Sequence, residues 1–328
     1  MLIDPTQALR NAPTAARAQR TASGAPAADL PAMPAEAQPW LAEAARAIGQ
    51  AGNAAAYFAN TGLLSLDAVN VLIFCQQATP PRWTVLGYVK QPAGVQTSLW
   101  SEALLRANNV AMAIDSCAFC TDAQGTAVLL KQIPTYHYGD VQALAEALET
   151  LDELAAGLRV TVHAAATIPT EAAESPLPDT PPLSPELARL KDSMDALVER
   201  EMNVVWHRPF IEQALRTLDL PVPQQAIGNA GAFKVGGRLV EVIASPDNRH
   251  LLLTTSVSMP LDTLAQRQAA LGSNLLLMTT AHCSLALTPT GASLQSRWDA
   301  TDQDGTALAG WLDEFVSFAI AFDTRQRP

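Results

Sequence analysis

Apolar positions along the chain alternate between strand-like and helix-like spacing, and the same order of elements occurs twice. In the first block, runs rich in β-branched and aromatic residues predict strands at 68–76, 83–90, 110–120 and 126–133. Helical spacing predicts helices at 39–60, 98–108 and 140–159. Gly49 and Gly52 weaken the middle of the first of these helices, because glycine is a poor helix former.

The second block repeats this order. Strands are predicted at 232–235, 239–244, 250–259, 275–288 and 292–298, and helices at 209–220, 261–271 and 306–323. Leu251, Leu253 and Val257 alternate with polar residues, so this strand has one buried face and one solvated face.

Three segments fall outside the two blocks. Residues 1–36 contain few large apolar side chains and are expected to be a disordered tail, with a docking or export segment as the alternative. Six prolines in and just beyond residues 164–183 predict a stiff, extended linker. Ser184 and Pro185 begin a charged connecting helix over 184–204. The expected domains are therefore 37–163 and 205–328.

Landmarks in the two blocks keep a nearly constant separation. Cys283 minus Cys117 is 166, and Gly291 minus Gly125 is also 166. A single long period indicates a duplicated domain rather than a solenoid, whose repeat would be much shorter. The fold class predicted from this is α+β, with two tandem α-β-β-β-α-β-β-α domains, each an antiparallel sheet with helices.

Topology, size, acidity and the closing elements carry a family resemblance. The run LLLMTTAHCSLALTPTGASLQSRW at 275–298, followed by GTALAGWLDEFVSFAIAF at 305–322, resembles the end of class I type III secretion chaperones of the Tir-chaperone-like family. The resemblance covers about 41–160 and 205–325. It implies a binding protein that holds an extended segment of a secreted effector without ATP. Family members are homodimers of half this length, so two copies in one chain imply an internal pseudo-dimer that is monomeric overall.

Composition narrows the partner class. A net charge of −11 and a pI near 4.9 disfavour nucleic acid, because phosphate binding needs clustered Lys and Arg. No apolar run reaches the length of a bilayer span, and the N-terminus lacks a Sec signal pattern. Four cysteines in so long a chain do not make a disulfide framework, so a cytoplasmic protein is expected.

The residues offer little chemistry. Cys117 and Cys120 invite a redox or zinc interpretation, but both fall in a predicted strand, and zinc would need two more ligands with suitable spacing. We expect structural thiols, no cofactor, no metal and no enzymatic activity. The alternatives are a secretion-associated scaffold or regulator with the same fold, or an enzyme with an unrecognised site.

The first block's strands are apolar on both faces, so one face either meets the second block or binds a partner. By the family resemblance, partners lie across the first helix and first strands of each block. The candidate partner-binding residues are Phe58, Val71, Ile73, Leu86, Phe210, Leu215 and Val240. Burial in the core is the alternative role for each of them.

Overall fold

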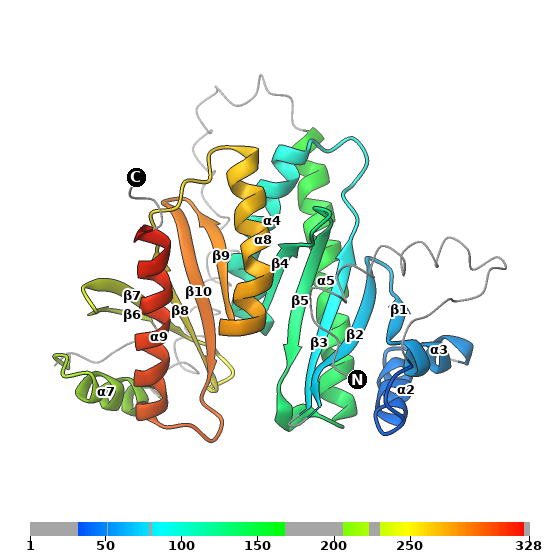
Figure 1. Ribbon diagram of the computed structural model, residues 1–328, viewed down its shortest axis with the longest axis horizontal. Helices are drawn as coiled ribbons and strands as arrows, with labels where there is room; N and C mark the ends of the chain where they lie inside the picture. The colour runs from blue at the N-terminus through cyan, green and yellow to red at the C-terminus, as the bar shows by residue number, and fades with distance from the viewer. Residues whose placement is uncertain (1–31, 51, 79–80, 168–205, 223–229, 325–328) are drawn as a thin grey trace, which may run out of the picture. The chain divides into compact units, whose positions relative to one another are not determined.

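The computed structural model describes residues 32–50, 52–78, 81–167, 206–222 and 230–324 (Figure 1). The connecting helix expected at 184–204 lies outside these residues, as does most of the expected linker. The first residues of that linker, 164–167, belong to the end of a helix. Residues 1–31 of the expected tail also lie outside.

The chain is α+β, as predicted. Its first strands and helices are α2 (Gln38–Ala47), α3 (Asn53–Thr61), β1 (Leu63–Ser65), β2 (Val69–Ala78), β3 (Pro81–Val89), α4 (Thr97–Asp115), β4 (Cys117–Thr121), β5 (Ala127–Ile133), the 3₁₀ helix η1 (Thr135–His137) and α5 (Val141–Thr167). From residue 206 onward the described elements are α7 (Arg208–Thr217), β6 (Ala230–Val235), β7 (Arg238–Ala244), β8 (His250–Ser256), α8 (Leu264–Ala281), β9 (Cys283–Thr288), β10 (Gly291–Asp299) and α9 (Gly305–Thr324).

Two five-stranded sheets have the same topology. The first has the order β1-β2-β3-β5-β4 and the second the order β6-β7-β8-β10-β9. The ladders β1–β2, β2–β3, β3–β5 and β4–β5 are antiparallel, as are β6–β7 and β7–β8. Identical strand order supports the duplication that the residue spacing indicated.

The chain packs as two compact units that do not coincide with the two sequence blocks. The first unit contains the described residues up to His163 together with Met259–Gln295. The second contains the described residues between Ala164 and Ser258 together with those from Ser296 onward. Helix α8 and strand β9 were expected in the second domain, but they pack against α4 and β4 in the first unit (Figure 1).

The single helix expected at 39–60 is two helices. Gly49 has φ +81° and Gly52 has φ +58°, backbone conformations that L side chains rarely adopt. The N–H groups of Ile48 and Gly49 close the end of α2 by bonding to the carbonyls of Ala44 and Arg46. The two glycines therefore end one helix and permit the next, rather than weakening a continuous one.

Two strands that were expected to be long are largely helical. Helix α4 runs to Asp115 and α8 runs to Ala281, so the strands expected at 110–120 and 275–288 begin only at Cys117 and Cys283. Both helices end at a residue in the left-handed conformation, Ser116 and His282, and 282 − 116 is again 166.

Two buried asparagines organise the core of the first unit. Asn108 Oδ1 accepts the N–H of Phe119 at 2.6 Å, and its Nδ2 donates to the carbonyls of Phe119 and Leu285 at 3.2 and 3.0 Å. Asn274 reciprocates: Oδ1 accepts the N–H of Leu285 at 2.6 Å, and Nδ2 donates to Leu285 and Phe119 at 3.0 and 3.3 Å.

These bonds satisfy two strand edges at once. β4 and β9 are the last strands of their sheets, so their outer backbone groups have no strand partner. Both asparagines are 0% exposed, and burial of unpaired backbone groups would be costly. The arithmetic 274 − 108 = 166 and 285 − 119 = 166 shows that the network is a twofold repeat within the unit.

The packed residues of the first unit include some before residue 37, the start expected from sequence. Met33 is buried at 7% exposure, its N–H donates to the carbonyl of Asn60, and its own carbonyl accepts from Gln38. Residues 32–36 therefore belong to the folded unit and not to the tail.

Two truncations test this boundary. Deletion of residues 1–31 is expected to change the melting temperature by no more than a degree or so, because the composition of that stretch offers little surface to bury. Deletion of 1–36 removes a buried Met and two hydrogen bonds, a loss of about 2 kcal/mol or more, or several degrees. Differential scanning calorimetry of both variants measures the difference. Equal melting temperatures would contradict the packing of Met33.

Candidate peptide-binding edge

Six of the seven residues expected to bind a partner lie in the core instead. Each at most 1% exposed, they are Phe58, Val71, Ile73, Leu86, Leu215 and Val240. These side chains are therefore not accessible to a bound segment in this conformation. Phe210 remains half-buried, and its ring lies 5.8 Å from Trp298 and 6.1 Å from Trp206 between centroids.

The second unit has an open strand edge that was not predicted from the sequence. β6 and β7 form a hairpin in which Val235 pairs with Arg238 around Gly236 and Gly237, whose φ angles are +55° and +82°. Two positive φ angles in a two-residue loop define a type I′ turn, which suits the twist of a hairpin. A Cβ at Gly236 would also crowd Val316 at 3.1 Å.

The hairpin register determines which backbone groups point outward. In a two-residue hairpin the pair next to the turn is hydrogen-bonded, and bonded and non-bonded pairs then alternate. Lys234, Ala232 and Ala230, which face Leu239, Glu241 and Ile243, are therefore in non-bonded pairs. Their N–H and C=O groups point away from β7, toward the free edge of the sheet.

β6 is the first strand of its sheet, so this edge has no strand neighbour. Within the described residues, the outward backbone groups of Ala230, Ala232 and Lys234 make no hydrogen bond. Such a row of donors and acceptors is a template for another strand.

Apolar side chains stand beside this edge on one face. Leu239 is 52% exposed and Ile243 is 43% exposed, while Val240 and Val242 on the opposite face are buried. Glu241 lies between the two exposed side chains. We name the face that carries Leu239, Glu241 and Ile243 the outer face of β6–β7. The exposed apolar pair is consistent with a binding surface.

Helix α9 packs against the other face of the hairpin. α9 contacts both α7 and β6, with Leu312, Phe315 and Ala319 buried. Arg238 forms an ion pair with Asp323 near the end of α9, and Asp323 also accepts the N–H of Ser258 at 2.8 Å. These contacts fix the hairpin on its inner side and leave the outer face open.

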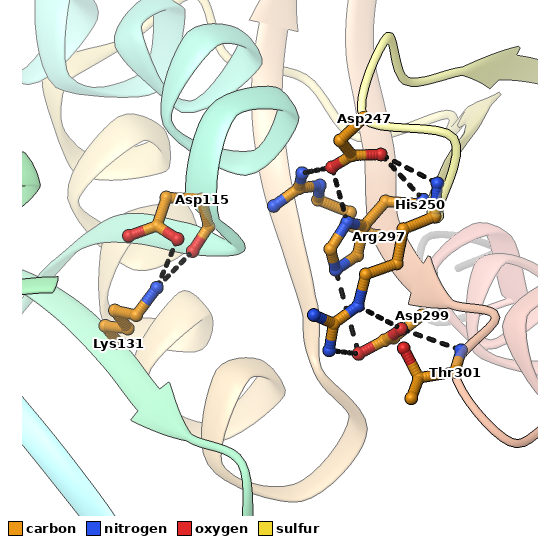
Figure 2. A network of polar contacts seen from close by, with 8 residues as sticks. Asp115, Lys131, Asp247, His250, Arg297, Asp299 and Thr301 are labelled. Carbon is orange, nitrogen blue, oxygen red and sulfur yellow. Dashed lines mark hydrogen bonds and ion pairs between the residues drawn. The ribbon is translucent and has the colours of Figure 1, made fainter. Parts of the chain in front are cut away.

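A charged network lies at the far end of the same strands (Figure 2). Arg249 donates to both oxygens of Asp299 at 2.9 and 2.8 Å, and Asp299 accepts the N–H of Thr301. The ring of His250 contacts Asp247 at 2.7 Å through Nδ1, and Arg297 contacts the same carboxylate at 2.9 Å. The network ties the β7–β8 turn to the end of β10.

Burial shapes the protonation of this network. Partial burial, with a further contribution from Arg297, lowers the pKa of His250 despite Asp247 and Asp299 beside it. Burial alone would raise the pKa of Asp247, but hydrogen bonds from the His250 ring and from the N–H groups of Arg249 and His250 lower it below its usual value.

These shifts predict acid sensitivity in the second unit. A histidine whose folded pKa is lowered contributes stability above its unfolded pKa of 6.5, and this is lost as the pH falls below that value. Asp247 follows the same direction below its ordinary value of 3.8. Urea unfolding between about pH 7 and pH 5 should show the first loss, and His250→Gln should reduce it. His282 also has a lowered pKa, so the reduction is partial. An unchanged slope in the variant would contradict the assignment.

The cysteines are placed as the sequence indicated. Cys117 and Cys120 lie in β4 and are both buried, and burial raises the pKa of the Cys120 thiol, with a further contribution from Cys117. A raised pKa keeps the thiol protonated and disfavours nucleophilic chemistry. In the part of the chain that the structure describes, His, Cys, Asp and Glu form no group of three or more able to hold a metal ion.

One described helix differs from the sequence expectation. The segment Gly305–Asp323 has the length and apolar composition of a membrane span, whereas the sequence reading found no such run. This segment is α9, which packs against α7 and the sheet of the second unit.

Comparisons with known proteins do not identify a family for this chain. No family model matches the chain, and no curated protein matches it. The ExoT–SpcS complex from Pseudomonas aeruginosa matches with 24% identity over 36% of this chain and 98% of that chain, at a TM-score of 0.30. The HopA1–SchA chaperone–effector complex matches with 11% identity over 38% of this chain and 97% of that chain, at a TM-score of 0.33. Scores this low do not establish a shared fold.

Proposed function

We propose that this chain is a single-chain chaperone of type III secretion class that binds an extended segment of a secreted effector and keeps it competent for secretion without ATP. The two repeats take the place of two subunits, so the protein is a cytoplasmic monomer with an internal pseudo-twofold relation. The reciprocal bonds of Asn108 and Asn274 support this, because they have the form of an isologous dimer contact within one chain.

The open edge of β6 carries the binding proposal. An extended peptide adds to a sheet edge through main-chain hydrogen bonds, while neighbouring side chains give specificity. Ala230, Ala232 and Lys234 offer those main-chain groups, and Leu239 and Ile243 offer exposed apolar contacts alongside. The client is therefore an unfolded segment rather than a folded domain.

Co-purification from the native host tests this function. The wild-type chain should bring down one or a few secreted proteins. Leu239→Glu should lose them while its melting temperature stays unchanged, because the side chain is 52% exposed and its charge remains solvated.

Val160→Glu is the matched control, since Val160 is 72% exposed on a helix of the other unit. It should retain the same proteins. Capture of nothing by the wild-type chain, or equal capture by both variants, would contradict the proposal.

A further inference from the structure

We propose that the two repeats are not equivalent and that each chain takes up one client strand, on β6 and not on β1. This inference rests on the proposed function and makes it specific. β1 and β6 occupy the same position in their sheets, so a duplicated chaperone would be expected to offer two such edges. The contacts of the two strands differ.

The edge at β1 is short and already partly occupied. Ile73 donates to the carbonyl of Gly62 and Leu66 to that of Val69, so the groups pointing outward belong to Leu63 and Ser65. The N–H of Leu63 donates to Thr61 Oγ1 at 3.2 Å. This edge therefore offers the outward groups of only two residues, and the donor of Leu63 is already used.

Helix α3 prevents β1 from extending. The helix ends at Thr61, and Gly62 follows in the left-handed conformation with φ +72°. A Cβ at Gly62 would collide with the carbonyl of Ile73, so the chain is fixed closely at this point. Leu63 and Leu64 are 6% and 3% exposed, and β1 therefore presents no exposed apolar side chain beside its edge.

The edge at β6 is longer and open. It has six residues, of which three direct their main-chain groups outward. Ala230 and Ala232 are exposed and small, so side chains of an added strand can pass over them. The side chains of the added strand would then reach the exposed side chains of β7, the next strand of the sheet.

Those side chains indicate the chemistry of the client. On the outer face, Ala230 of β6 is paired with Ile243 of β7, Ala232 with Glu241, and Lys234 with Leu239. An added residue over Ala230 meets an apolar side chain, a long basic residue over Ala232 reaches Glu241, and an acidic residue beside Lys234 completes a cross-strand pair. Antiparallel pairing is the commoner arrangement. In that direction the client sequence has, from its N-terminus to its C-terminus, an acidic residue, any residue, a basic residue, any residue and an apolar residue.

A synthetic probe tests this reading on the full-length chain. The probe is a peptide of about eight residues, threonine-based, with glutamate, arginine and leucine at alternate positions. Titrated at millimolar concentration and followed by amide NMR, it should shift the signals of Ala230, Ala232 and Lys234. The signals of Leu63 and Ser65 should stay in place. A probe with glutamate and arginine exchanged should bind about three- to tenfold more weakly.

Two substitutions make the test specific. Ala232→Pro removes an outward N–H without touching the ladder to β7, so it should fold and abolish the shifts, whereas Ala232→Ser keeps the N–H and a small side chain and should keep them. Lys234→Glu keeps the backbone and should restore affinity when the probe's own glutamate is changed to lysine. This second variant decides the question even if the proline variant fails to fold.

The outcomes separate this inference from the function itself. Shifts at Leu63 and Ser65 as well would show two equivalent edges and overturn the inference, while the chaperone function would stand. No shift at β6, or indifference to the exchange of charges, would also overturn it. Absence of any secreted protein in the co-purification would instead overturn the proposed function.

Discussion

Replacing Asn108 by leucine should destabilise the first unit by about 3 kcal/mol or more. The substitution leaves the N–H of Phe119 without an acceptor in a fully buried site and removes one donor from each of two carbonyls. Urea unfolding followed by tryptophan fluorescence measures the change, because Trp40, Trp83 and Trp100 all lie in this unit.

Asn60→Leu is the matched control. Asn60 is exposed on α3 and its side chain bonds only to the carbonyl of Ala56 among the described contacts, so its loss should stay within about 0.5 kcal/mol. The double variant Asn108→Leu with Asn274→Leu should cost more than the sum of the single variants. Each carbonyl then loses both donors, and residues in one network are not additive. Equal effects of Asn108→Leu and Asn60→Leu would mean that the network contributes nothing.

The same asparagines explain why the ends predicted for two helices were wrong. In α4 the buried residues Leu104, Leu105, Asn108, Ala111 and Met112 keep three-four spacing, and α8 repeats it with Ala270, Leu271, Asn274, Leu277 and Met278. In the sequence, the polar Asn108 predicts that the apolar face of the helix ends there. In the structure, Asn108 lies in the centre of that face. Its partners are strands distant in sequence, so no local pattern reveals its burial.

Strand positions were predictable where one face is polar. β8 alternates buried with half-buried positions, with Leu251 and Leu253 buried and His250 and Thr254 half-buried, and its predicted start at residue 250 is confirmed. The predicted bounds of β7, 239–244, are also confirmed to within one residue, but its faces are harder to assign, because five of the residues from Leu239 to Ala244 are apolar and only Glu241 is charged. That single residue marks the outer face, and it could have identified Leu239 and Ile243 as the exposed side chains.

The candidate site depends on pairing, which sequence does not specify. Whether a strand edge is open is decided by what lies next to it, and β1 and β6 differ in this although their sheets have the same order. The sequence analysis also favoured large apolar residues on the first helix and first strands of each block as partner-binding residues. Large apolar side chains on central strands are usually core, and six of the seven proved to be so.

Replacing an isoleucine by aspartate in each sheet distinguishes a buried core position from an exposed position beside a strand edge. Ile73→Asp is expected to destabilise the first unit by more than about 4 kcal/mol, because Ile73 is 0% exposed and an unpaired carboxylate would be buried. Ile243→Asp makes the same change on the second strand of the other sheet, where the side chain is 43% exposed. Its effect on stability should stay within about 1 kcal/mol.

Circular dichroism on melting, combined with client co-purification, distinguishes the two variants. Ile243→Asp should keep the fold and lose the client, because it replaces an apolar contact beside the β6 edge and adds a second negative charge near Glu241. Ile73→Asp should lose both together, or fail to accumulate as folded protein. If Ile73→Asp remained folded and lost the client selectively, the binding surface would lie on β2 and the sheet of the first unit, as the sequence alone suggested. If Ile243→Asp in addition left the client bound, binding at the edge of β6 would be excluded as the main contact.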